Sequence, residues 1–462
     1  MLFNSIEFAI FLPIVFAIYW LLNKHLRWQN LFVVVASYVF YGWWDWRFLI
    51  LIAFTSFCSW GSGLLISQSP KPKLWLTLNI VINLLILGIF KYFNFFVGSF
   101  CDLFGLTNSI AIKVILPVGI SFYTFQALSY SIDVYRKRIE PTRDIVAFFA
   151  YVSFFPQLVA GPIERATNLL PQFERQRTFN YEEAVDGMRR ILWGLFKKIV
   201  VADNCATYVD QVWNNYTNEC GSTLALAAIL FAFQIYGDFS GYSDIAIGSA
   251  KLFGIRLKDN FLTPYFSRNV AEFWKRWHIS LNTWFVDYVY IPLGGSREGR
   301  WKTIRNTFVI FLLSGLWHGA NWTYVTWGLY HALLFVPLIL IGRTKAYTGT
   351  ATWKQIPQIL LTFALVVLGW IIFRAPSIAD AWGYISSLFT HSVAFPMVIS
   401  GLKRTIIAVL ILIVVEWLQR KKNHGLDLAN LHWSLRYCFY YLLILIILEL
   451  GGNSQSFIYF QF

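Results

Sequence analysis

A histidine stands between two long apolar stretches of this chain. His318 lies in the sequence SGLWHGANW, after the apolar segment Asn306–Leu316 and before Trp322–Ile341. An ionisable side chain at membrane depth is costly and is usually retained because it has a function. Imidazole also exchanges a proton readily near neutral pH. We therefore predict that His318 acts as a general base. The alternative is a core histidine held by one hydrogen bond.

Two polar residues follow this histidine. Asn321 comes three positions later, which is the same face if the motif is helical, so its amide can donate to a developing oxyanion. Its alternative role is to cap the end of a helix. His331 lies thirteen positions after His318, and we expect a structural role for it.

Two carboxylates lie in the stretch QIYGDFSGYSD. Asp238 and Asp244 are six positions apart, a spacing that does not place both on one face of a helix. A break at Gly237 or Gly241 would be needed to make them an acid–base pair, so we expect buried hydrogen-bond anchors. No group of carboxylates, histidines or the five scattered cysteines has metal-ligand spacing. No metal site and no bound cofactor are predicted.

The elements that carry these residues are predicted to be membrane helices. The chain is 57% hydrophobic and 13% charged, against roughly a quarter charged in soluble domains. Its apolar runs are far longer than the roughly ten-residue alternating segments of a membrane barrel. The net charge of +14 comes from short loops between apolar runs, which is typical of cytoplasmic loops. We predict an all-α polytopic membrane protein that binds the lipid bilayer and no nucleic acid.

The apolar segments differ in length. Ile6–Leu22 is the first predicted span, and the basic residues directly after it place that end in the cytoplasm and Met1 outside. A second basic loop at 420–422 and one further helix place the C-terminus outside as well. Segments well short of about 20 residues are expected to enter the membrane and return. The other predicted segments are Leu31–Tyr41, Phe48–Ile66, Leu74–Phe100, Val114–Ile132, Ile145–Ala160, Ile191–Val201, Thr223–Tyr236, Asn306–Leu316, Trp322–Ile341, Ile356–Phe373, Thr405–Leu418 and Arg436–Leu450.

Four sequence patches in this order resemble one family. They are QIYGDFSGYSDIAIG at 234–248, FWKRWHISLNTWFVDYVYIPLGG at 273–295, SGLWHGANWTYVTWGLYHA at 314–332 and the terminal FIYFQF. Together they resemble the membrane-bound O-acyltransferase (MBOAT) family over essentially the whole chain. The resemblance is strongest to the bacterial branch that holds the membrane subunits of alginate and peptidoglycan O-acetylation. The D-alanyl transferase of teichoic acids is a more distant relative.

The resemblance implies a fold and an activity. The expected fold is one domain over residues 1–462, a ring of about ten to twelve transmembrane helices with re-entrant and interfacial helices. Its cytosolic and external funnels would meet at a thin centre near the histidine. The expected reaction passes an acyl group from a cytosolic thioester, acetyl-CoA in the acetylating members, to an extracytoplasmic acceptor. An SGNH-type partner outside the bacterial inner membrane would complete the acetylation of the polysaccharide.

The resemblance also assigns roles to residues. His318 corresponds to the invariant histidine of the family. His278 matches its second polar active-site position, where it would orient His318 or polarise the donor carbonyl; an interfacial histidine on an aromatic helix is the alternative. The predicted donor ligands, which would meet the phosphates of coenzyme A or the acidic surface of a carrier protein, are Arg268, Lys275 and Arg276. A positive-inside anchor explains these three basic residues equally well. The predicted funnel-lining residues are Gln234, Asp238, Asp244 and Trp317.

The terminal FIYFQF contains a candidate nucleophile. If the C-terminus is outside, it can fold back into the external funnel, and Tyr459 can carry the acyl group as an ester before passing it on. An aromatic anchor at the membrane interface is the alternative.

Two other functions stay open at the level of sequence. One is D-alanyl transfer from an acyl carrier protein to a cell-wall polymer. The other is a transporter in which His318 couples protons, although the internal repeats typical of transporters are not visible. The sequence does not identify the glycan acceptor.

Overall fold

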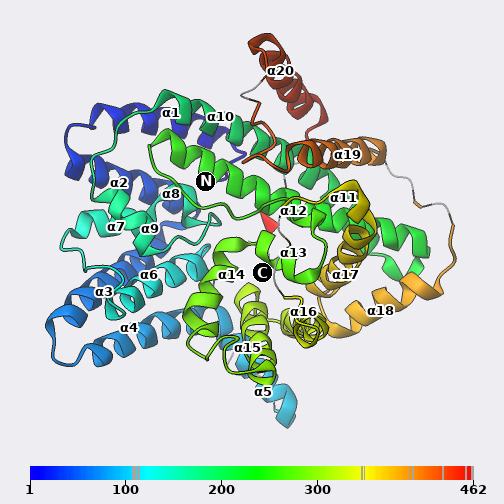
Figure 1. The fold of residues 1–462 in the computed structure, drawn as a ribbon, viewed down its shortest axis with the longest axis horizontal. Coiled ribbons are helices and arrows are strands. Elements are labelled where there is room, and N and C mark those ends of the chain that lie inside the picture. The colour runs from blue at the N-terminus through cyan, green and yellow to red at the C-terminus, as the bar shows by residue number, and fades with distance from the viewer. Residues whose placement is uncertain are drawn as a thin grey trace. The chain divides into compact units, whose positions relative to one another are not determined.

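The regular structure of this chain is helical. The computed structural model describes residues 1–106, 112, 115–344, 347, 349–394, 396–397, 400–428, 431–452 and 455–458, and no β-strand occurs in them (Figure 1). The all-α prediction is therefore confirmed. Among the described residues, six helical stretches are long and apolar enough to cross a membrane, which supports a multi-pass membrane protein. These stretches are Leu26–Gln68, Pro72–Phe104, Gly221–Leu252, Trp322–Leu340, Trp353–Arg374 and Trp433–Leu450. The larger count of ten to twelve stays a prediction.

The chain divides into two compact units. The first holds Met1–Met188 with Ala246–Lys258, and the second holds Arg189–Ile245 with Asp259–Phe462. The prediction of a single domain stays a prediction. All the candidate site residues in the described ranges belong to the second unit.

The first unit contains nine helices entirely within its described residues, and it is tied together by a buried arginine. Arg177 donates to the side-chain oxygens of Gln29 at 2.7 Å and Asn30 at 2.6 Å, and Asn30 donates to the carbonyl of Phe173 at 2.7 Å. This network joins α2 to the chain around α9. The helices are α1 (Ile6–Leu21), α2 (Leu26–Asp45), α3 (Leu49–Gln68), α4 (Pro72–Leu87), α5 (Phe93–Phe104), α6 (Ile120–Tyr135), α7 (Ile145–Ser153), α8 (Phe155–Leu158) and α9 (Ala166–Phe173). A π-helical turn, Gly88–Tyr92, lies between α4 and α5.

Two helices contribute residues to both units. They are α10 (Tyr181–Leu195) and α12 (Gly221–Leu252). The remaining helices belong to the second unit: α11 (Asp203–Trp213), α13 (Val270–Arg276), α14 (Ile279–Phe285), α15 (Arg300–His318), α16 (Trp322–Leu340), α17 (Ile356–Arg374), α18 (Ile378–Thr390), α19 (Leu402–Gln419) and α20 (Trp433–Leu450). Within that unit, α20 projects from its neighbours and is mostly exposed (Figure 1).

Two of the predicted apolar segments are shorter than the helices that contain them. Leu31–Tyr41 is the central part of α2, and Asn306–Leu316 is the central part of α15, which begins at Arg300. Helices extend beyond their apolar cores because the backbone hydrogen bonds of a helix form equally well between polar residues, and the last groups at each end can bond to side chains or water. The short apolar lengths therefore do not by themselves require these segments to enter the membrane and return.

Glycines allow helices of the second unit to pack with their backbones in close approach. A β-carbon on Gly315 of α15 would lie 2.2 Å from the carbonyl oxygen of Tyr324 in α16, and one on Gly328 would lie 2.3 Å from that of Phe311. Small residues at such crossings are typical of helix pairs in membranes. This close antiparallel pair fixes the turn between its helices, and that turn contains the SGLWHGANW motif.

Candidate active site

The motif around His318 is a tight turn between two helices. Helix α15 ends at His318, and α16 begins after Asn321, whose Oδ1 accepts a hydrogen bond from the N–H of Thr323 at 3.0 Å. The Asn321 Nδ2 donates to the carbonyl of Pro376 at 2.9 Å. Because the motif is not one continuous helix, His318 and Asn321 do not share a helical face. Asn321 has the capping role that the sequence left as its alternative.

The two predicted active-site histidines lie together in the second unit. The ring centroids of His278 and His318 are 6.3 Å apart, and the ring of Trp317 lies 5.7 Å from the first and 5.1 Å from the second. All three side chains are buried. A cavity of about 20 Å³, roughly the space of one water molecule, is lined by both histidines. The other lining residues come from α13, α14 and α15 and are mostly apolar: Trp274, Leu281, Asn282, Phe285, Ile310, Phe311 and Ser314.

His278 occupies an unusual backbone position. It precedes α14 with φ of +44°, in the left-handed region that side chains with a β-carbon seldom adopt. Such strain costs on the order of 1–3 kcal/mol and tends to occur at functional sites. Burial lowers the pKa of His278 to about 3, so its ring is neutral at physiological pH. The ring of Phe239 lies 4.7 Å from it.

His331 has the structural environment expected for it. The indole Nε1 of Trp274 donates to His331 Nδ1 at 3.3 Å. A β-carbon on Gly369 would lie 2.8 Å from His331 Nε2, so the histidine packs directly against the backbone of α17. His331 therefore holds Trp274, one of the residues that line the small cavity.

A much larger cavity in the same unit carries most of the nearby positive charge. Its volume is about 460 Å³, and we call it the basic cavity. Its cationic lining residues are Lys197, Lys275, Arg276, Arg420, Lys421 and Lys422, and its acidic ones are Asp244, Glu272 and Glu416. Six cations against three carboxylates make this an anion-attracting cavity. Two of the three predicted donor ligands, Lys275 and Arg276, thus line one cavity.

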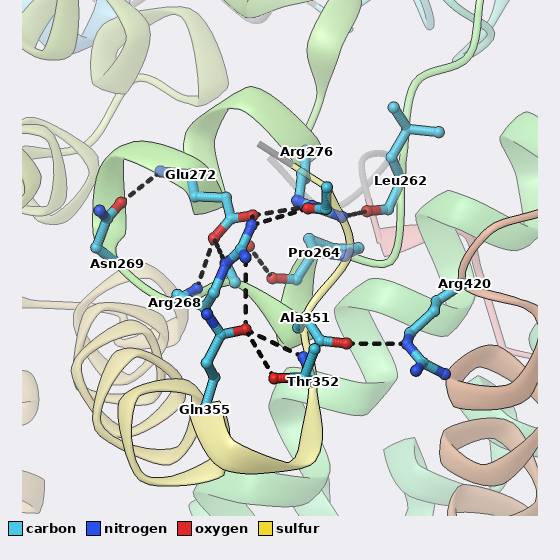
Figure 2. Close-up of polar contacts among 12 residues, drawn as sticks. Leu262, Pro264, Arg268, Asn269, Glu272, Arg276, Ala351, Thr352, Gln355 and Arg420 are labelled. Atoms are coloured by element: carbon cyan, nitrogen blue, oxygen red, sulfur yellow. Dashed lines mark hydrogen bonds and ion pairs between the residues drawn. The ribbon is translucent and has the colours of Figure 1, made fainter. Parts of the chain in front are cut away.

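The third predicted donor ligand, Arg268, is held in a buried network beside that cavity (Figure 2). Its Nη2 lies 2.7 Å from Glu272 Oε1, and Arg276 Nη2 lies 2.8 Å from the same oxygen. Arg268 also donates to Gln355 Oε1 at 3.4 Å, and its guanidinium lies over the ring of Tyr347. Burial opposes ionisation of Glu272, but hydrogen bonds from Arg268 and the charge of Arg276 lower its pKa below the usual range. Glu272 thereby fixes both arginines.

The two carboxylates of α12 have separate partners. Asp244 pairs with Lys197 at 2.6 Å and with Arg190 at 2.8 Å, whereas Asp238 pairs with Lys198 at 2.9 Å. Helix α12 is continuous across Gly237 and Gly241, so the break considered from the sequence does not occur. The two carboxylates are buried anchors, as expected, and not an acid–base pair.

Apart from Arg268 and Asn321, the predicted site residues fall into three groups. His278, Trp317 and His318 meet around the small cavity, and Lys275, Arg276 and Asp244 line the basic cavity. Gln234 and Asp238 are buried on α12 and line neither of these two cavities. Tyr459 lies outside the described residues.

Sequence reasoning missed three charged residues in apolar surroundings. Lys197 and Lys198 lie inside the segment Ile191–Val201, and Glu416 lies inside Thr405–Leu418. Glu416 accepts a hydrogen bond from the hydroxyl of Tyr236 at 2.6 Å, at the basic cavity. The available signal was the presence of an ionisable side chain in an apolar segment, which by itself indicates a functional or paired residue.

Apolar helices around a buried histidine pair and an anion-attracting cavity define a helical membrane protein with an internal site. This chain belongs to the membrane-bound O-acyltransferase family, whose family model matches residues 134–379. It is therefore an O-acyltransferase of the membrane.

Three relatives illustrate the activities within this family. The chain is 40% identical to the probable alginate O-acetylase AlgI of Pseudomonas aeruginosa, over 84% of this chain and 75% of that protein. It is 34% identical to the peptidoglycan O-acetyltransferase of Helicobacter pylori, over 82% and 78%. It is 29% identical to the teichoic acid D-alanyltransferase of Bacillus subtilis, over 55% and 68%. The greater identity and coverage thus lie with the O-acetylating relatives.

Proposed function

We propose that this protein takes an acetyl group from acetyl-CoA on the cytosolic side and passes it across the membrane for O-acetylation of an extracytoplasmic polysaccharide, with His318 as general base. The acceptor would be alginate-like or peptidoglycan, the substrates named for the more similar relatives. The observation that carries the proposal is the pair of buried imidazoles, 6.3 Å apart, at a small and mostly apolar cavity.

The proposed chemistry balances without a cofactor. A hydroxyl oxygen attacks the thioester carbon while the neutral imidazole of His318 accepts the hydroxyl proton. The carbon–sulfur bond breaks, and the departing thiolate takes the proton back from the imidazolium. His278, kept neutral by burial, would orient His318 or donate its ring N–H to the thioester carbonyl. Asn321, which caps α16, would contribute to catalysis by fixing the turn that follows His318.

The basic cavity is the proposed donor site. Lys275 and Arg276, with Lys421 and Lys422 from the end of α19, would meet the phosphates of coenzyme A. Arg268 would act mainly by fixing Glu272 and thereby Arg276, since its guanidinium is committed to that carboxylate. The walls of the two funnels would be supported by Gln234, Asp238, Asp244 and Trp317.

The acceptor side is proposed from the sequence and the family. Tyr459 would carry the acyl group as an ester and pass it to an SGNH-type partner. The protein would lie in the bacterial inner membrane as one domain of ten to twelve crossings, with both termini outside. Replacing the Tyr459 hydroxyl in Tyr459→Phe should abolish transfer to the external acceptor while the protein still inserts. Transfer by that variant would contradict the relay.

Turnover of acetyl-CoA by the purified protein tests the proposal. We expect wild type to consume the thioester and His318→Ala to lose about 100- to 10,000-fold, the usual contribution of a general base. His391→Ala serves as the matched control, because His391 lies outside both cavities and contacts the carbonyl of Glu219.

Each outcome of this assay has a distinct meaning. Equal turnover in wild type and a well-folded His318→Ala would overturn the catalytic role of His318. If neither turns over acetyl-CoA, the acetyl-CoA proposal fails. Supplying an acyl carrier protein would then test the D-alanyl-type alternative.

A further inference from the structure

The chain after α20 is bound to the second unit through its backbone. The Leu450 carbonyl accepts a hydrogen bond from Asn204 Nδ2 at 2.8 Å, and the Gly452 N–H donates to the carbonyl of Ile199 at 3.1 Å. A β-carbon on Gly452 would lie 2.9 Å from the Asn204 nitrogen, so glycine permits this approach. The C-terminal segment is therefore docked and does not simply leave the helix.

Further along, a buried lysine holds the same segment. Lys198 Nζ lies 2.8 Å from Asp203 and 2.9 Å from Asp238, and it donates to the carbonyl of Gln455 at 3.0 Å. The Gln455 N–H donates to the Asp203 carboxylate. The Ile458 N–H donates to Asp238 Oδ2 at 2.6 Å. One ammonium and two carboxylates thus bind backbone groups at both ends of 455–458.

This arrangement is buried and charged. The side chains of Lys198, Asp203 and Asp238 are 8%, 2% and 4% exposed. Burying charge is unfavourable unless every charge is paired and hydrogen bonded, and such groups in a membrane protein usually have a function. Because Lys198 pairs with both carboxylates, its loss would leave two buried carboxylates close together and the Gln455 carbonyl without its donor. The docking therefore depends on this one ammonium group.

The docked segment also reaches the ring that contacts the histidine pair. Phe457 lies 4.7 Å from the ring of Tyr242 and 6.2 Å from that of Phe239, both on α12. Phe239 also contacts His278, at 4.7 Å between ring centroids. Asp238, which binds Ile458, directly precedes Phe239 in the sequence. The same turn of α12 thus binds the C-terminal segment and packs against the candidate active site.

We propose that Lys198 is a positioning residue, which with Asp203 and Asp238 forms a latch that fixes residues 455–458 against the turn of α12 whose Phe239 contacts His278. The latch binds main-chain groups, so it sets the position of the segment without depending on its side chains. Its effect on acyl transfer rests on the proposed function, whereas the docking of the segment does not. The latch acts through the segment and does not contact the donor.

Hydrogen–deuterium exchange of the full-length protein measures the docking directly. We expect Lys198→Met to raise the exchange rate of the 455–458 amides at least about tenfold, the effect of losing a hydrogen bond to a charged group. Lys198→Arg should restore slow exchange because it keeps the charge. Lys197→Met is the matched control for exchange, since Lys197 is the adjacent residue and pairs with Asp244 on the same helix. Asp238→Asn removes charge with little change of size and should also speed exchange at Ile458.

Transfer kinetics test the positioning role. We expect Lys198→Met to lower kcat for transfer to the external acceptor about tenfold or more with the KM for acetyl-CoA unchanged, and Lys198→Arg to recover it. A residue that only stabilises the fold would lower the amount of active protein and would leave segment exchange unchanged.

The outcomes separate the two proposals. Slow exchange at 455–458 in Lys198→Met and in Asp238→Asn would overturn the latch. Fast exchange with unchanged transfer would overturn the positioning role. If wild type shows no acyl transfer at all, the proposed function fails, while the exchange data still decide whether the latch exists.

Discussion

The two histidines are held by aromatic rings on several sides. Around His318, the ring centroids of Trp317, Trp327 and Phe373 lie 5.1, 5.2 and 5.3 Å away, all nearly perpendicular to the imidazole. Edge-to-face packing of this kind restricts ring rotation and excludes water. The proposed general base needs its nitrogens to point in a fixed direction, and this packing would provide that orientation before any substrate binds.

The neutral state of His278 gives a prediction about acid stability. His278 lies outside the six candidate spans, and burial lowers its pKa from 6.5 to about 3. Below pH 6.5 the unfolded chain therefore binds a proton that the folded protein does not. The stabilisation is complete above the unfolded pKa and is lost as pH falls toward 3. We expect the melting temperature of wild type to fall on acidification from about pH 7 to about pH 4, and that of His278→Gln to fall less.

Thermal unfolding of the purified protein over this pH range measures the difference. One titrating group contributes at most about 1.4 kcal/mol per pH unit. His432→Gln, which removes an exposed histidine, should keep the wild-type slope. Identical pH slopes in His278→Gln and wild type would contradict a buried neutral imidazole at this position.

At the scale of elements, one close helix crossing positions both ion-pair groups of α12. A β-carbon on Gly241 would lie 2.8 Å from the carbonyl oxygen of Gly194, and one on Gly237 would lie 2.8 Å from that of Lys197. The partner is the end of α10 and the π-helical turn Phe196–Ala202 that follows it. Because the backbones approach this closely, Lys197 and Lys198 are brought within ion-pair distance of Asp244 and Asp238.

This crossing predicts that a methyl group added at Gly241 destabilises the protein, whereas one added at an open glycine elsewhere does not. Gly241→Ala should destabilise the protein by about 1–3 kcal/mol, because the helices must separate to accept the methyl group. Gly61→Ala in α3 should be neutral or stabilising by up to about 1 kcal/mol, since no atom lies within 4 Å of the added carbon. Melting temperatures of the two variants test the difference. A Gly241→Ala protein as stable as Gly61→Ala would contradict the close backbone approach.

At the scale of the whole molecule, the excess positive charge gathers partly in one place. The chain has a net charge of +14, and six cations line the basic cavity. Coenzyme A carries several phosphate charges, so clustered cations would raise its local concentration and bind it through charge-assisted hydrogen bonds. The effect should weaken at high ionic strength, because the cations at the end of α19 are exposed.

A paired lysine substitution tests this role of the cavity. Replacing Lys421 and Lys422 by alanine should raise the KM for acetyl-CoA by about 3- to 30-fold with little change in kcat, since two partly exposed contacts of roughly 0.3–1 kcal/mol each are lost. The matched control is the double variant of Lys403 and Arg404, which lie at the other end of α19 and do not line the cavity. Equal KM values in both double variants would argue against donor binding at the basic cavity.

The amino-acid sequence alone determined the class of this protein and singled out two histidines that the structure brings together. Apolar runs of this length can satisfy their backbone hydrogen bonds within a bilayer as helices. The patches around His278 and His318 identified the family. Local sequence left the role of Asn321 open, because a cap and a helical face look alike until the end of α15 is known.

Only the tertiary structure decided which charges meet. Lys198 and Asp203 are close in sequence, but Asp238 and the Gln455 backbone come from two other parts of the chain, and their pairing with Lys198 depends on packing that spacing does not reveal. Glu272 is different, because it pairs with Arg268 and Arg276 at a spacing of four residues, and only the structure shows that Arg276 lines the basic cavity whereas Arg268 does not. Periodicity reports the face of a single helix, whereas an ion pair depends on how two elements pack against each other.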